Sequence, residues 1–149
     1  MTHATKTAFL KYASLGLIAF GMLTSLTLLP VLQPVMGFFL DLAFLSPLGS
    51  DHQLDSEAAR LWIGISGGLL AGWGATLYLL TTEVYAKDAQ TGGRIILVGV
   101  VTWFIVDSTG SVVAGAPFNA VLNVSFLLLF TLPVLWTGKA SASLNSPAG

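Results

Sequence analysis

A single carboxylate, Asp107, lies in one of the most apolar regions of the chain, the stretch WFIVDSTGS at residues 103–111. It is the only ionisable residue deep in any apolar segment long enough to cross a membrane. An aspartate at the centre of a membrane helix costs about 2.5 to 3.5 kcal/mol. A buried carboxylate must therefore be protonated, hydrogen-bonded or close to water. Asp107 is the first candidate for a functional group.

Polar partners for Asp107 are present at helical spacing. Trp103 and Ser111 lie four residues on either side of it and so share its helical face. Asn119 and Asn123 are four residues apart on the next apolar segment, so they also share one face. The link between the two segments, around residues 115–117, is short enough to force an antiparallel hairpin. The sequence thus predicts one polar cluster of Asp107, Ser111, Asn119 and Asn123, with Trp103 beside it.

The cluster has two main interpretations at this stage. It can be structural, since interhelical hydrogen bonds in membranes contribute about 0.6 to 2 kcal/mol each. It can instead be a ligand-binding or proton-handling site, because ionisable residues inside membranes often mark such sites. Contact with a partner subunit is a third possibility. The spacing alone leaves all three open.

The composition places these segments in a membrane. The 149 residues are 54% hydrophobic and 9% charged, against about 25% charged in ordinary soluble domains. The mean hydropathy is +0.82. A net charge of -1 implies no electrostatic attraction to nucleic acid. The absence of cysteine excludes disulfides, iron–sulfur clusters and thiol catalysis.

The chain is predicted to be an all-α membrane protein, with four transmembrane helices in a bundle. The helices are expected at about 8–29, 58–81, 95–114 and 118–136. They form one domain, residues 1–137, followed by a flexible tail at 138–149. A short interfacial or re-entrant helix is expected at about 35–45, in a connection that is apolar but too short to span. Gly92-Gly93 is expected to form a turn between the second and third helices.

Asp41 and the acidic residues that follow it occupy this first connection. Asp41 is expected either to face water or to reach toward the Asp107 cluster. Asp51, His52, Asp55 and Glu57 could attract a hard cation, but they match no ligand spacing. Capping by Asp55 or Ser56, with Glu57 in the first helical turn, explains them more simply. No metal site is predicted.

The distribution of lysine and arginine predicts the orientation. With the N-terminus in the cytoplasm, five cationic residues lie inside and Arg60 alone lies outside. The five are Lys6, Lys11, Lys87, Arg94 and Lys139. Both termini are therefore expected to be cytoplasmic, and the Asp107 cluster to lie near the extracytoplasmic side.

Three glycines on the second segment, Gly64, Gly68 and Gly72, repeat every four residues. Small residues at this spacing allow two membrane helices to approach closely. The neighbour can be a helix of the same chain, a second copy of the protein or another membrane protein.

The runs WFIVDSTGSVVAGAPFNAVLN and GGLLAGWGATLYLL resemble a set of small bacterial four-helix membrane proteins of unassigned function. The resemblance covers the second to fourth predicted helices. It implies a four-helix architecture and a location in the bacterial inner membrane, and it implies no activity.

The function favoured at this stage is a non-enzymatic accessory or structural membrane subunit. It would pack through its second helix against itself or a larger complex. The alternative is a small ligand-binding or transport protein with its polar site around Asp107. No catalytic residue is predicted, because no intramembrane Ser–His or Ser–Lys pair, HExxH motif or phosphate loop occurs. The cofactor is left unspecified: haem lacks an intramembrane histidine ligand, whereas quinones, carotenoids and lipids leave no sequence signature.

Overall fold

The computed structural model describes residues 1–136, which are helical and contain no strand. The elements are α1 (His3–Leu26), η1 (Pro30–Leu32), α2 (Gln33–Phe44), α3 (Glu57–Leu79), η2 (Leu80–Tyr85), α4 (Ala89–Val113) and α5 (Pro117–Leu135). Four helices are long and apolar enough to cross a membrane: α1, α3 continued through η2, α4 and α5. The prediction of four such helices and one shorter apolar helix is confirmed. The predicted tail, 138–149, and residue 137 lie outside the described residues.

Capping residues set where the helices begin. The Thr2 hydroxyl accepts a hydrogen bond from the Thr5 N–H at 3.2 Å, so α1 begins five residues earlier than the hydrophobic run suggested. The Ser56 hydroxyl accepts from the Ala59 N–H at 3.2 Å, and Glu57 occupies the first turn of α3, as predicted. Helix boundaries therefore follow side-chain caps more closely than they follow hydropathy.

The prediction of a turn at Gly92-Gly93 is wrong. Both glycines lie inside α4, which begins at Ala89 because the Asp88 carboxylate accepts hydrogen bonds from the backbone N–H groups of Gln90 and Thr91. A Cβ on Gly92 would come within 2.6 Å of the Tyr85 backbone nitrogen. These glycines thus allow close helix packing. Glycine suits both a turn and a close contact because it has no side chain.

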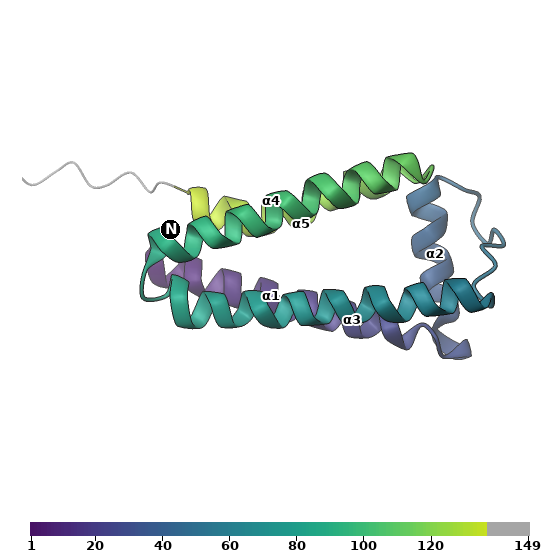
Figure 1. The fold of residues 1–149 in the computed structure, drawn as a ribbon, viewed down its shortest axis with the longest axis horizontal. Helices are drawn as coiled ribbons and strands as arrows, with labels where there is room; N and C mark the ends of the chain where they lie inside the picture. The colour runs from purple at the N-terminus through teal and green to yellow at the C-terminus, as the bar shows by residue number, and fades with distance from the viewer. Residues whose placement is uncertain (137–149) are drawn as a thin grey trace, which may run out of the picture.

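The helices form two layers (Figure 1). α1 packs mainly on α3, and α4 packs mainly on α5. The layers lie closest together at the end that holds the N-terminus, and α2 stands between them at the other end. We call the first the closed end and the second, marked by α2, the open end.

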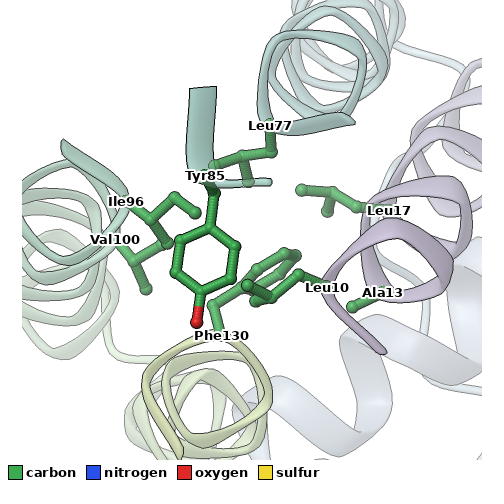
Figure 2. Close-up of a cluster of buried hydrophobic side chains, with 8 residues drawn as sticks. All are labelled: Leu10, Ala13, Leu17, Leu77, Tyr85, Ile96, Val100 and Phe130. Carbon is green, nitrogen blue, oxygen red and sulfur yellow. The ribbon is translucent and has the colours of Figure 1, made fainter. Parts of the chain in front are cut away.

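The closed end holds the hydrophobic core. Each of the four long helices contributes to it, and Figure 2 shows the Tyr85 ring lying between Leu10 of α1 and the α4 side chains Ile96 and Val100. The core residues are Leu10, Ala13, Leu17, Leu77, Tyr85, Ile96, Val100 and Phe130. Leu10, Ile96 and Val100 are fully buried, so the two layers are joined firmly here.

Small residues bring α1 and α3 together. A Cβ on Gly67 would come within 2.7 Å of the Gly21 carbonyl oxygen. A Cβ on Gly74 would come within 2.8 Å of the Ile18 backbone nitrogen. Such close backbone approach leaves no room for larger side chains, which is the usual way membrane helices gain packing contacts.

Candidate functional site

A tight hairpin between α4 and α5 positions the polar cluster. Gly115 adopts a positive φ of 83°, which a residue with a side chain rarely does, and Pro117 occupies the first turn of α5. The two helices run antiparallel and pack along their length. The hairpin turn lies at the open end, next to α2 (Figure 1).

The hairpin brings the predicted cluster residues together. The Asn119 amide donates to Ser111 Oγ at 2.8 Å and to Asp107 Oδ2 at 3.3 Å. The Asn123 amide donates to the same Asp107 oxygen and to Ser108 Oγ at 3.2 Å. Because a carboxylate can only accept hydrogen bonds, the amide nitrogens must face it. Each N–H of both asparagines is thereby directed at a side chain of α4.

Ser108 belongs to the cluster although the sequence analysis did not include it. It lies three residues before Ser111, so the two residues share a helical face, and each hydroxyl accepts a hydrogen bond from an asparagine of α5. The i, i+3 spacing of Ser108 and Ser111 was the available signal. Asn123 is only 5% exposed, so its two hydrogen bonds satisfy an amide that would otherwise be costly to bury.

The cluster forms part of the wall of a cavity of about 590 Å³ between the two layers. All five α-helices line this cavity, and most of the lining side chains are apolar. Asp107, Asn119 and Asn123 are among its polar lining groups. Ligand pockets have volumes of about 300 to 1,000 Å³ and combine apolar walls with a few placed polar groups. The cavity has the size and the lining of such a pocket.

Aromatic rings surround the polar part of the cavity. The Trp103 ring lies 6.2 Å from Phe126, edge to face, and 5.2 Å from Trp73. Phe126 lies 5.7 Å from Phe20, which in turn lies 6.4 Å from Phe39 of α2. A continuous series of rings therefore runs from α2 through Phe20, Phe126 and Trp103 to Trp73 of α3.

Asp41 takes neither of the two orientations expected for it. It is 3% exposed and accepts hydrogen bonds from His52 Nε2 and from the Gly49 N–H, each at 2.7 Å. The hydrogen bond from His52, followed by that from Gly49, holds the pKa of the Asp41 carboxyl below its ordinary value. These bonds fasten the loop after α2 back onto α2.

His52 connects this loop to the cavity. Its ring stacks on Phe44 with a centroid distance of 5.9 Å, and it also lines the cavity. From the sequence, His52 was grouped only with the nearby acidic residues Asp51, Asp55 and Glu57, because it lies eleven positions after Asp41 and no spacing rule joins a helix to an irregular loop. Within residues 1–136, no three His, Cys, Asp or Glu side chains gather as a metal-binding group.

The glycine stripe Gly64, Gly68 and Gly72 lies beside the α1–α3 crossing and not within it. A Cβ on Gly68 or Gly72 would meet no heavy atom of residues 1–136 within 4 Å, and one on Gly64 would make an ordinary contact at 3.7 Å. Gly67 and Gly74, which are seven residues apart, make the close approach instead. The stripe is an open surface of α3 in the described part of the chain.

Comparison with known proteins gives no match for this chain: no family model, curated protein or solved structure is similar to it.

Proposed function

We propose that the protein is an integral membrane protein that binds a small lipophilic molecule in the cavity between its two layers. The observation that supports this most is the position of the one deep ionisable side chain. The Asp107 carboxylate lies in the wall of a cavity large enough for a ligand. A cluster serving only to join α4 to α5 has no need of a cavity beside it.

The hydrogen bonds in the cluster fit a binding role. Asn119 and Asn123 fix the carboxylate through Oδ2, so its position is set before any ligand arrives. Preorganised polar groups in an apolar pocket orient a ligand at little additional entropic cost. Binding, rather than catalysis, is proposed because a single carboxylate supplies no second catalytic group.

The membrane setting is part of the proposal. The cationic residues near the helix ends support an orientation with both termini in the cytoplasm, as expected for a bacterial inner-membrane protein. In this orientation the closed end is cytoplasmic and the cavity lies in the extracytoplasmic half. α2 would then be an interfacial helix that covers the outer part of the four-helix bundle.

The test uses a cavity-filling variant and a neutral probe. Ser66 of α3 and Ser125 of α5 are both exposed, but only Ser66 lines the cavity. In maltoside micelles, bromoadamantane should quench the tryptophan fluorescence of the native protein in a saturable way, because bromine quenches indoles on contact. Ser66→Phe should remove the saturable part, and Ser125→Phe should retain it. Linear quenching that is the same in all three proteins would overturn the proposal.

The second candidate function is the accessory subunit, which the open stripe favours. Gly68 and Gly72 offer a flat helix face to a second copy or to another membrane protein. Gly68→Leu should then abolish a defined oligomer or stoichiometric co-purification, measured by light scattering and mass of the solubilised complex. Gly99→Leu is the matched control, since Gly99 of α4 is equally open and lies outside the stripe. A monomer in native protein and both variants would rule this candidate out.

A further inference from the structure

We infer that the ligand of the cavity carries a positively charged nitrogen: it is a lipophilic amine whose ammonium group binds Asp107. This inference rests on the proposed function and specifies the chemistry of the same site. Three features of the cavity lead to it, namely its hydrogen-bonding groups, its charge and its aromatic wall.

The first feature is the set of hydrogen-bonding groups left for a ligand. Both N–H groups of Asn119 and both of Asn123 are occupied by α4 side chains. The second carboxylate oxygen of Asp107, Oδ1, accepts no hydrogen bond from residues 1–136, and neither do the amide oxygens of the two asparagines. An ionised carboxylate and amide oxygens are acceptors only. The site therefore offers acceptors to a ligand that must supply donors.

The second feature is charge. The described lining contains two ionisable side chains, Asp107 and His52, and the His52 imidazole is already bound to Asp41 at 2.7 Å. No lysine or arginine of residues 1–136 lines the cavity to neutralise Asp107. A carboxylate in an apolar cavity without a counter-charge is unfavourable, and a bound ammonium group would provide that charge. A carboxylate or phosphate headgroup would instead be repelled.

The third feature is the aromatic wall. Trp103 lies one helical turn before Asp107 on the same face of α4, and its ring contacts Trp73 and Phe126. The electron-rich faces of indole rings attract cations, most strongly when water is excluded. A carboxylate beside tryptophan and phenylalanine rings is the arrangement that recognises an alkylammonium group better than a neutral hydroxyl.

Two sources could supply this chemistry: a free lipophilic amine and the headgroup amine of an aminophospholipid. Both present an ammonium group with N–H donors next to an apolar body. A phospholipid would also bring a phosphate, for which the described lining provides no lysine or arginine. The experiment therefore includes a competition with phosphatidylethanolamine to identify the source.

The experiment compares probes with one apolar cage and three headgroups. Aminoadamantane, adamantanol and adamantane carboxylate are titrated in maltoside micelles by competition with bromoadamantane, with tryptophan fluorescence as readout. We expect the amine to bind about tenfold more tightly than the alcohol, the increment of a charge-assisted hydrogen bond, and the carboxylate most weakly. Competition by phosphatidylethanolamine would identify the lipid as the source, and its absence would identify the free amine; either supports the ammonium chemistry.

Variants test the role of each group. Asp107→Asn should reduce the preference for amine over alcohol to near unity, and Asp51→Asn, a matched change on the outer loop, should leave it intact. If Asp107→Asn does not fold, Trp103→Leu should weaken amine binding more than alcohol binding. Saturable bromoadamantane binding with equal affinities for amine and alcohol would overturn this inference while leaving the proposed function in place. If the native protein shows no saturable bromoadamantane binding, both this inference and the proposed function are overturned.

Discussion

The closed and open ends of the molecule are built from the same four long helices but are packed in opposite ways. At the closed end, Leu10, Ile96 and Val100 are fully buried, and Gly92 lies directly against the backbone of Tyr85. At the open end the layers are held apart by α2, and a cavity of about 590 Å³ remains between them. One end is packed tightly and the other retains a space with a carboxylate in its wall.

This difference shows where the protein has room for function. Apolar side chains gain little from association within a bilayer, because lipid chains are equally apolar, so membrane helices depend on close packing. The closed end supplies that packing through Gly92 and through a buried cluster of aliphatic side chains around Tyr85 and Phe130. The open end can then keep a cavity, because its helices are already joined elsewhere.

The largest expected effect is the difference in stability lost when a large side chain is replaced by alanine at each end. Phe130→Ala at the closed end removes a ring that is 1% exposed and should lower the free energy of unfolding by about 3 kcal/mol. Leu122→Ala, also in α5, removes a half-buried side chain that already borders the cavity and should cost below about 1 kcal/mol. Unfolding in mixed micelles, followed by circular dichroism, measures both. Equal losses would mean that the open end is packed as tightly as the closed one.

The next effect tests the glycine contact at the closed end. Gly92→Ala should cost about 2 kcal/mol, because the added methyl group would overlap the Tyr85 backbone and overpacked sites lose about 1 to 3 kcal/mol. Gly99→Ala, seven residues along the same helix, meets no heavy atom of residues 1–136 within 4 Å and should leave stability unchanged or slightly higher. Thermal unfolding of the two variants in the same detergent measures this difference in stability. A stable Gly92→Ala protein would show that η2 and α4 can separate without cost.

A smaller effect is expected from the polar cluster at the open end. Asn123→Leu keeps the size of the side chain and removes its hydrogen bonds to Asp107 and Ser108. The loss should be about 1 kcal/mol, the typical contribution of interhelical hydrogen bonds in membranes. Val124→Leu, an exposed neighbour, is the control. If Asn123→Leu unfolds as readily as Phe130→Ala, the cluster is a main structural support and not chiefly a site.

The smallest effect concerns the loop after α2, which lies at the open end. The folded-state pKa of Asp41 is lowered below its ordinary value of 3.8, first by the hydrogen bond from His52. A lowered carboxyl pKa stabilises the fold above the unfolded-state value, and this contribution is lost as pH falls through the folded-state pKa. Protection of the Gly49 amide from hydrogen exchange, corrected for intrinsic rates, should be constant at neutral pH and decline only below pH 3.8. Asp41→Asn should show the weakened protection at every pH, and pH-independent protection in the native protein would contradict the pairing.

The sequence predicted much of the α4–α5 hairpin and its residues. The spacing of Asp107 and Ser111 on one segment and of Asn119 and Asn123 on the next defined two facing polar stripes. The short link at Gly115 left one way to join them. Local geometry of this kind is accessible because helical periodicity and loop length are both encoded in neighbouring residues.

Other features depended on contacts between distant segments. Gly92-Gly93 has the composition of a turn, but the Asp88 cap starts α4 before these glycines, and Tyr85 packs closely against them. The close approach of α1 and α3 uses Gly67, which faces Gly21, and Gly74, which faces Ile18, and it does not use the more regular stripe Gly64–Gly68–Gly72. Periodicity identifies candidate faces on a helix, but it does not say which face a partner helix meets.

The sequence by itself determined the class of the protein, its four long apolar helices and the identity of its deep carboxylate, because hydropathy and helical spacing are properties of contiguous residues. Only the tertiary structure decided that Asp107 borders a cavity, that Asp41 pairs with His52, and that one end of the molecule is closed while the other is open. These depend on how far apart the two layers lie. That separation is set by α2 at one end and by the close contact of Gly92 with Tyr85 at the other, and helical periodicity encodes neither.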